Sequence, residues 1–174
     1  MKKIIPSTLT MGNLLLGFMA ILFISNKEYS TAAMLIGLGL FFDFIDGYSA
    51  RKLNAESALG KELDSLADMV TFGVAPAMLA YFGSVHEIHF FGVFCCLIYV
   101  CCSALRLARF NISVHPSTSF IGMPMPLAAT LMLFITLLNP YATAIGSLLI
   151  SFLMISRLWF PSLKNIELEV KEDY

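Results

Sequence analysis

The chain has 174 residues, of which 58% are hydrophobic and only 13% are charged, and its formal net charge is −1. About a quarter of the residues of a soluble domain are charged, so this composition excludes a water-soluble globule. It also excludes a disordered chain, because disorder requires low hydrophobicity. Four closely spaced Cys do not build a disulfide framework, and a near-neutral chain offers no basic surface for nucleic acid. The class that remains is an integral membrane protein.

Long stretches without Asp, Glu, Lys or Arg divide the chain into six predicted membrane helices. In chain order we expect them at residues 7–26, 30–51, 61–83, 88–108, 120–138 and 140–158. A membrane helix needs about 20 mostly apolar residues. Asn139-Pro140 separates the last two helices, because proline disfavours a helical residue before it. Gly122, Pro124 and Pro126 are expected to distort the start of the fifth helix. The predicted fold class is therefore all-α and polytopic.

The two ends of the chain lead to different expectations. The first helix is expected to remain in the mature protein, because it is longer than the apolar core of a signal peptide and no small-x-small cleavage site precedes a soluble domain. Residues 1–160 are predicted to form one transmembrane domain, and residues 161–174 a short polar tail in the cytoplasm.

The basic residues predict the orientation in the membrane. Ten of the eleven fall on one side of the six-helix topology, and only Lys27 falls on the other. The ten are Lys2, Lys3, Arg51, Lys52, Lys61, Arg106, Arg109, Arg157, Lys164 and Lys171. Lysine and arginine accumulate in cytoplasmic loops. We therefore expect a multi-pass protein of the cytoplasmic membrane with both termini in the cytoplasm.

Four aspartates lie inside predicted apolar helices, where an ionisable group is costly and is therefore a functional candidate. Asp43 and Asp46 are three residues apart on the second helix, and Asp64 and Asp68 are four apart on the third. Each pair therefore shares one helical face. The segment between the two helices is short, which makes the helices antiparallel neighbours. We expect the four carboxylates to meet on the cytoplasmic side.

Carboxylates that converge in a low dielectric repel one another unless cations neutralise them. Hard divalent cations with oxygen ligands suit such a site. Two of them, about 4 Å apart and bridged by shared carboxylates, would assist phosphoryl transfer. We therefore predict two divalent cations, Mg²⁺ or Mn²⁺. Two alternatives remain: the aspartates could be helix caps or groups near the membrane surface, or they could line the ion or proton pathway of a small cation transporter.

The aspartates belong to a longer pattern with fixed spacing. It runs Asp43-x2-Asp46-Gly47-x2-Ala50-Arg51-x8-Gly60-x3-Asp64-x3-Asp68. At every fixed position this pattern resembles the signature of the CDP-alcohol phosphatidyltransferase family. The segments Ile5–Ile21, Leu63–Tyr81, Ala104–Asn111 and Phe120–Ala129 are similar to the membrane-integral phosphatidylserine synthases within that family. The resemblance covers nearly the whole chain.

The resemblance implies a reaction and an assembly. The phosphatidyl group of CDP-diacylglycerol would be transferred to the hydroxyl of L-serine, giving phosphatidylserine and CMP. The fold would have six membrane helices, would usually form a homodimer, and would open its active site to the cytoplasm. Two variants keep the same chemistry. The acceptor could be glycerol phosphate or inositol phosphate, which should require more basic residues, or the donor could be CDP-archaeol.

The resemblance also implies roles for the aspartates. One metal ion would be bound by Asp43, Asp46 and Asp64, and the second by Asp43, Asp64 and Asp68. The last of these, Asp68, would also be the general base that accepts the hydroxyl proton.

Three further residues acquire roles through the same resemblance. Gly47 and Arg51 match positions that hold the CDP moiety and its diphosphate. Ser57, six residues after Arg51, matches a hydroxyl that contacts a phosphate. All three would therefore bind CDP-diacylglycerol.

Four polar residues outside the signature are further candidates. Arg106 and Arg109 lie at the cytoplasmic end of the fourth predicted helix. A guanidinium suits a carboxylate or a phosphate, so one or both are expected to bind the serine carboxylate or a substrate phosphate. The alternative is contact with lipid headgroups. Thr10 and Asn13 lie early in the first helix and either pack helices by hydrogen bonding or contact the nucleotide of CDP-diacylglycerol.

Overall fold

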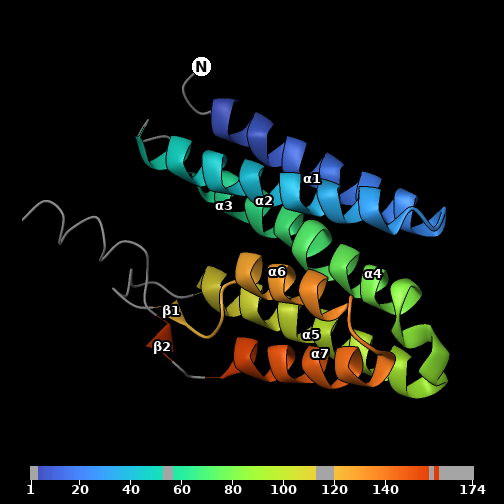
Figure 1. Ribbon diagram of the computed structural model, residues 1–174. Helices are drawn as coiled ribbons and strands as arrows, with labels where there is room; N and C mark the ends of the chain where they lie inside the picture. Colours follow the sequence, from blue (N-terminus) through green and yellow to red (C-terminus); the bar gives the residue numbers. More distant parts are fainter. Residues whose placement is uncertain (1–3, 53–56, 113–119, 157–158, 161–174) are drawn as a thin grey trace, which may run out of the picture.

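A computed structural model describes residues 4–52, 57–112, 120–156 and 159–160, which form a bundle of long helices (Figure 1). The helices are α1 (Ile4–Ser25), α2 (Tyr29–Lys52), α3 (Ala58–Asp68), α4 (Ala75–Gly83), α5 (His89–Ile112), α6 (Met125–Ile135) and α7 (Pro140–Ile155). A π-helical turn, η1 (Met69–Val74), joins α3 to α4, and a 3₁₀ turn, η2 (Val85–Ile88), leads into α5. The predicted tail, residues 161–174, lies outside the described residues.

The segment α3–η1–α4 forms one continuous rod through the middle of the bundle (Figure 1). Helices α1 and α2 pack side by side against one flank of this rod, and α5 and α6 pack against the other. Helix α7 packs on α5 and α6. Successive long segments run in opposite directions. The start of α1, the end of α2, the start of α3 and the ends of α5 and α7 therefore lie together at one end of the bundle.

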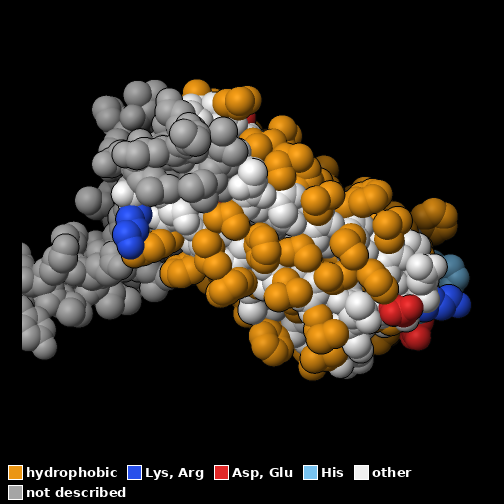
Figure 2. Space-filling model, turned by 90° about the horizontal axis from the view of Figure 1, so that it is seen from above, with side chains coloured by type: hydrophobic (Ala, Val, Ile, Leu, Met, Phe, Trp, Pro, Cys, Tyr) orange, Lys and Arg blue, Asp and Glu red, His pale blue; other side chains and the backbone are white. Residues whose placement is uncertain are grey.

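Four of the described segments are long and apolar enough to cross a membrane. They are Ser7–Ser25, Tyr29–Ser49, Ala58–Gly83 and Val85–Ile112. Large apolar side chains are exposed along them, and Phe90 is 91% exposed. Figure 2 shows apolar side chains over most of the described face and charged side chains at its two ends. An apolar surface of this extent is unfavourable in water and suits the interior of a bilayer, so the protein is membrane-integral.

The last two helices are shorter than a full membrane span. Helix α6 has 11 residues and α7 has 16. At 1.5 Å per residue these correspond to about 16 and 24 Å, against an apolar core about 30 Å thick. Six long helical segments follow one another along the described chain, but six membrane spans stay a prediction.

The fifth helix begins later than the sequence predicted. The expectation of a helix from residue 120 is wrong, because Phe120–Ile121 forms strand β1, which pairs antiparallel with β2 (Trp159–Phe160). Gly122 follows with φ +87°, and Pro124 is extended and precedes the first helical residue, Met125. The distortion expected from glycine and proline at this place is confirmed.

The π-helical turn lies where proline removes a backbone donor. Pro76 has no N–H, so the carbonyl of Phe72, four residues earlier, lacks its α-helical donor. The hydroxyl of the buried Tyr99 on α5 donates to that carbonyl at 3.0 Å. Next to it, the N–H of Ala75 donates to the carbonyl of Val70, which is the spacing of a π-helix. The Tyr99 hydrogen bond ties the rod to α5 one turn after the last signature aspartate.

Two glycines let α1 and α2 approach the rod closely. A Cβ added at Gly17 would clash with Oγ1 of Thr71 and lie 2.8 Å from its Cα, and one added at Gly39 would lie 2.6 Å from Cγ2 of Thr71. The hydroxyl of Thr71 donates to the backbone carbonyl of Asn13 at 3.0 Å. We call Asn13, Gly17, Gly39 and Thr71 the three-helix joint, because they connect α1, α2 and the rod.

We expect Gly17→Ala to lower the free energy of unfolding by about 1–3 kcal/mol, because the new methyl group would meet backbone atoms that cannot move aside. Thermal unfolding in detergent, followed by circular dichroism, measures this as a fall in Tm. Gly37→Ala is the matched control, since nothing lies within 4 Å of a Cβ added there and alanine favours the helix. Equal losses of Tm in the two variants would contradict the close packing at Gly17.

Candidate active site

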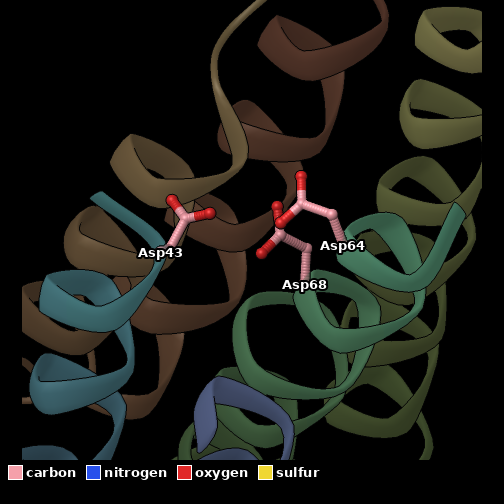
Figure 3. Close-up of side chains that lie close together, drawn as sticks. All are labelled: Asp43, Asp64 and Asp68. Carbon is pink, nitrogen blue, oxygen red and sulfur yellow. The ribbon is translucent and has the colours of Figure 1, made fainter. Parts of the chain in front are cut away.

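Three of the four signature aspartates meet between α2 and the rod. Asp43 lies on α2, Asp64 and Asp68 lie one turn apart on α3, and one carboxylate oxygen from each lies within 4.8 Å of the other two. Figure 3 shows the three side chains turned toward one another from the two facing helices. Asp46, buried three residues further along α2, interacts electrostatically with Asp68. We call Asp43, Asp64 and Asp68 the carboxylate cluster.

The carboxylate cluster fits a hard divalent cation. Its donors are all carboxylate oxygens, which suit Mg²⁺ or Mn²⁺. Within the described part of the chain, Oδ1 of Asp64 is buried and makes no hydrogen bond. A buried carboxylate oxygen without a partner is strongly unfavourable, and a bound cation would remove that penalty. The cluster and the fourth aspartate are therefore candidate ligands.

Helix α1 adds two buried polar side chains at this end of the bundle. Asn13 is fully buried, and its Nδ2 donates to Oδ1 of Asp68 at 3.3 Å. Thr10, three residues earlier on the same helical face, is buried as well. The sequence singled out both residues, but it could not pair Asn13 with Asp68, because 55 positions separate them.

The remaining signature residues lie at the end of α2 and the start of α3. Gly47 follows Asp43 by four residues and so shares its helical face. Arg51 is in the last turn of α2, but its side chain lies outside the part that the structure describes. Ser57 is the N-cap of α3, and its hydroxyl accepts from the N–H of Gly60 at 3.0 Å. A hydroxyl that accepts in this way can still donate to a phosphate, so the expected phosphate contact stays a prediction.

The two arginines of α5 have different surroundings. Arg106 is partly buried, and its charge interacts with the carboxylates of Asp68 and Asp43. Among the described residues, its buried Nε has no hydrogen-bond partner. Arg109 is exposed, and its Nη1 donates to the backbone carbonyl of Ile155, in the last turn of α7, at 3.1 Å. Arg106 therefore belongs to the surroundings of the carboxylate cluster, whereas Arg109 binds the end of α7.

A hydrogen-bond network that the sequence did not indicate joins α3 to the end of α5. Asn111 donates to Oε2 of Glu62 at 3.0 Å and accepts from the hydroxyl of Ser65 at 3.1 Å. Lys61 donates to the carbonyls of Phe110 and Asn111 at 3.3 and 3.1 Å, where a helix end leaves carbonyls without intrahelical donors. Partners 46 to 50 positions apart leave no local sequence pattern. The network holds the helix with two of the aspartates against the helix with both arginines.

The apolar helices and the carboxylate cluster define a membrane-integral protein with a candidate divalent-cation centre near one end of its bundle. Residues 3–160 match the family described as CDP-alcohol phosphatidyltransferase. The chain belongs to this family, and it is therefore an enzyme of the phosphatidyltransferase class rather than a small cation transporter.

Several known proteins are similar to this chain over most of its length. It is 45% identical over 162 residues to the CDP-diacylglycerol–serine O-phosphatidyltransferase of Bacillus subtilis, and the matched residues cover 92% of each chain. It is 36% identical to the protein of that name from Helicobacter pylori, over 95% of this chain and 75% of the relative. The archaetidylserine synthase of Methanothermobacter thermautotrophicus is 34% identical, over 90% of this chain and 69% of the relative. All three names include serine, and the archaetidylserine synthase is named for a different lipid from the other two.

We expect Asp64→Asn to weaken Mn²⁺ binding by about a hundredfold or more, since replacing a ligand should cost at least as much as replacing a group that only supports a ligand. Electron paramagnetic resonance of Mn²⁺ titrated into the purified protein measures the Kd without any substrate. Glu62→Gln is the matched control, because Glu62 is an exposed carboxylate on the same helix. An unchanged Kd in Asp64→Asn, or an equal loss in Glu62→Gln, would contradict a cation site at the carboxylate cluster.

Proposed function

We propose that this protein transfers the phosphatidyl group of CDP-diacylglycerol to the hydroxyl of L-serine, giving phosphatidylserine and CMP. The observation that carries the proposal is the carboxylate cluster between two membrane helices, in a chain whose relatives in Bacillus subtilis and Helicobacter pylori are named for this reaction. The donor is a lipid, and the acceptor is a small polar molecule. A site near one end of a membrane bundle would suit both, because the bilayer and the aqueous phase meet there.

Two divalent cations, Mg²⁺ or Mn²⁺, are proposed as cofactors. Asp43, Asp46 and Asp64 would hold one, and Asp43, Asp64 and Asp68 the other. When bound, such cations offset the negative charge of the diphosphate and so assist attack on phosphorus. The close approach of three carboxylates and the unpaired Oδ1 of Asp64 within the described chain support this assignment.

The side chains around the cluster would bind and orient the two substrates. Arg51 and Ser57 would hold the diphosphate, and Gly47, which has no side chain, leaves room beside Asp43 for the CDP moiety. Thr10, buried on α1 at the same end of the bundle, is proposed as a further contact of CDP-diacylglycerol.

Asp68 is proposed as the group that accepts the proton from serine. The serine oxygen forms a bond to the phosphorus that carries diacylglycerol, the bond from that phosphorus to the CMP oxygen breaks in line, and CMP leaves with the electron pair. The hydroxyl proton passes to the carboxylate of Asp68. Because a carboxylate that binds a cation is a weak base, the proton is expected to move late, when the oxygen is already bonding to phosphorus.

We also propose the membrane topology that the sequence predicted. The start of α1, the end of α2, the start of α3 and the end of α7 lie at the same end of the bundle (Figure 1), and α2 and α3 carry the carboxylate cluster. Basic residues gather at that end, and Lys27 lies in the turn between α1 and α2 at the other. The positive-inside rule then supports six passes through the cytoplasmic membrane, with both termini and the active site facing the cytoplasm. Residues 1–160 would form the membrane domain, and two copies would form a homodimer.

We expect purified protein to release CMP from CDP-diacylglycerol only when L-serine and Mg²⁺ or Mn²⁺ are both present. Chelation by EDTA should abolish release, because the diphosphate charge is then not offset. Parallel reactions with glycerol phosphate or inositol phosphate as the acceptor, and with CDP-archaeol as the donor, define the specificity. Release with glycerol phosphate but not with serine would change the assigned acceptor. Absence of release with every pair, together with cation flux in liposomes, would contradict the proposed chemistry.

Arg106 is proposed to bind the carboxylate of L-serine. Arg106→Gln is therefore expected to raise the KM for L-serine by about 10- to 100-fold, because one charge-assisted hydrogen bond is lost. Arg109→Gln removes the hydrogen bond to Ile155 and should lower Tm while leaving that KM within about twofold. Steady-state kinetics across serine concentrations distinguish the two. The reverse pattern would assign the serine carboxylate to Arg109.

A further inference from the structure

Asn13 combines burial and hydrogen bonding in a way that helix packing alone does not explain. Its side chain is fully buried on α1, and its Nδ2 donates to Oδ1 of Asp68 at 3.3 Å. Its own Oδ1 is buried without a hydrogen-bond partner among the residues that the structure describes. A buried carbonyl left in this state is unfavourable, so an apolar side chain of similar size would serve better for packing. What the amide adds at this place is a donor directed at Asp68.

The surroundings of Asn13 fix the direction of this donor. Turning the amide over would bring its carbonyl oxygen against the Asp68 carboxylate, and two acceptors would then face each other. On the other side, Oδ1 lies 2.9 Å from the position of a Cβ at Gly39, so α2 leaves the amide little space. The donor is therefore oriented before any ligand binds.

The three-helix joint lies one helical turn from the aspartates. On α2, Gly39 precedes Asp43 by four residues, and on the rod Thr71 follows Asp68 by three. Residues at these spacings share a helical face. The joint therefore connects the two helices that carry the carboxylate cluster, and Asn13 is the member whose side chain donates to one of its carboxylates.

We propose that Asn13 is a positioning residue that sets the carboxylate of Asp68 relative to Asp43 and Asp64. It would act through Asp68 and not through contact with the nucleotide. The inference rests on the proposed divalent-cation site, because a fixed carboxylate matters most when it must meet the geometry of a cation. Groups that hydrogen-bond to a metal ligand typically change metal affinity about 10- to 100-fold when they are replaced.

The affinity for Mn²⁺ without substrate tests this inference. Asn13→Leu keeps the branching of the side chain at Cγ and removes the donor, and we expect its Kd for Mn²⁺ to rise about tenfold. Asn13→Ala cannot overfill the space, so it gives the same test if the leucine variant does not fold. Thr71→Val is the matched control, because it removes the other hydrogen bond of the joint without touching Asp68. It should lower Tm but leave the Kd within about twofold.

A double-mutant cycle and the kinetics complete the test. In an Asp68→Asn background, Asn13→Leu should change the Mn²⁺ Kd by less than about twofold, because the partner of the amide is already altered. In CMP release, Asn13→Leu should lower kcat and leave the KM for CDP-diacylglycerol unchanged, whereas loss of a nucleotide contact would raise that KM.

Three results would overturn the inference: a wild-type Kd in both Asn13 variants, an equal loss of affinity in Thr71→Val, or an undiminished effect in the Asp68→Asn background. If the wild-type protein binds no Mn²⁺, the proposed cation site fails and the inference fails with it. If the wild type binds Mn²⁺ and the Asn13 variants bind it equally well, only the inference fails.

Discussion

Carboxylates placed between apolar helices impose the constraint on which the rest of this structure depends. A carboxylate moved from water into a low dielectric is strongly destabilised unless it is paired or binds a cation, and three of them lie here within 4.8 Å. The amide of Asn13 and the guanidinium of Arg106 stabilise the same negative charge. These groups do not balance it fully, since four aspartates carry more charge than one arginine. Divalent cations, which this family generally uses, would offset the remaining negative charge.

The rod that carries Asp64 and Asp68 is held from both flanks. On one side, glycines bring α1 and α2 so close that a single methyl group would clash with Thr71. On the other side, Tyr99 donates to the carbonyl that Pro76 leaves without a donor, and Asn111 connects α3 to the end of α5. Hydrogen bonds between membrane helices are individually modest, so several of them together with close packing are needed to keep the aspartates of two helices at a fixed separation.

We propose that the carboxylate cluster serves the chemistry common to the family, whereas residues on α5 distinguish the acceptor. The carboxylate cluster is formed by signature residues of α2 and α3, and the diphosphate of any CDP-alcohol would be bound there. The arginines come from α5, which packs on the opposite flank of the rod. Arg106 lies close enough to the cluster to interact with two of its carboxylates. An acceptor carboxylate would bind the guanidinium of Arg106, whereas an acceptor with an additional phosphate would require further positive charge.

The sequence by itself determined the class of the protein, the order of its helical segments and the four aspartates, because apolar runs and charges at helical spacing are local patterns. It also placed Asn13 and both arginines among the candidates without giving their partners. Only the tertiary structure paired Asn13 with Asp68, separated Arg106 from Arg109 and joined Asn111 to α3, because these contacts connect residues 46 to 55 positions apart. The strand at Phe120–Ile121 was decided in the same way, since a two-residue strand exists only through its pairing with Trp159–Phe160. Local patterns specify which residues share a helical face, whereas the close approach of helices specifies which side chains meet.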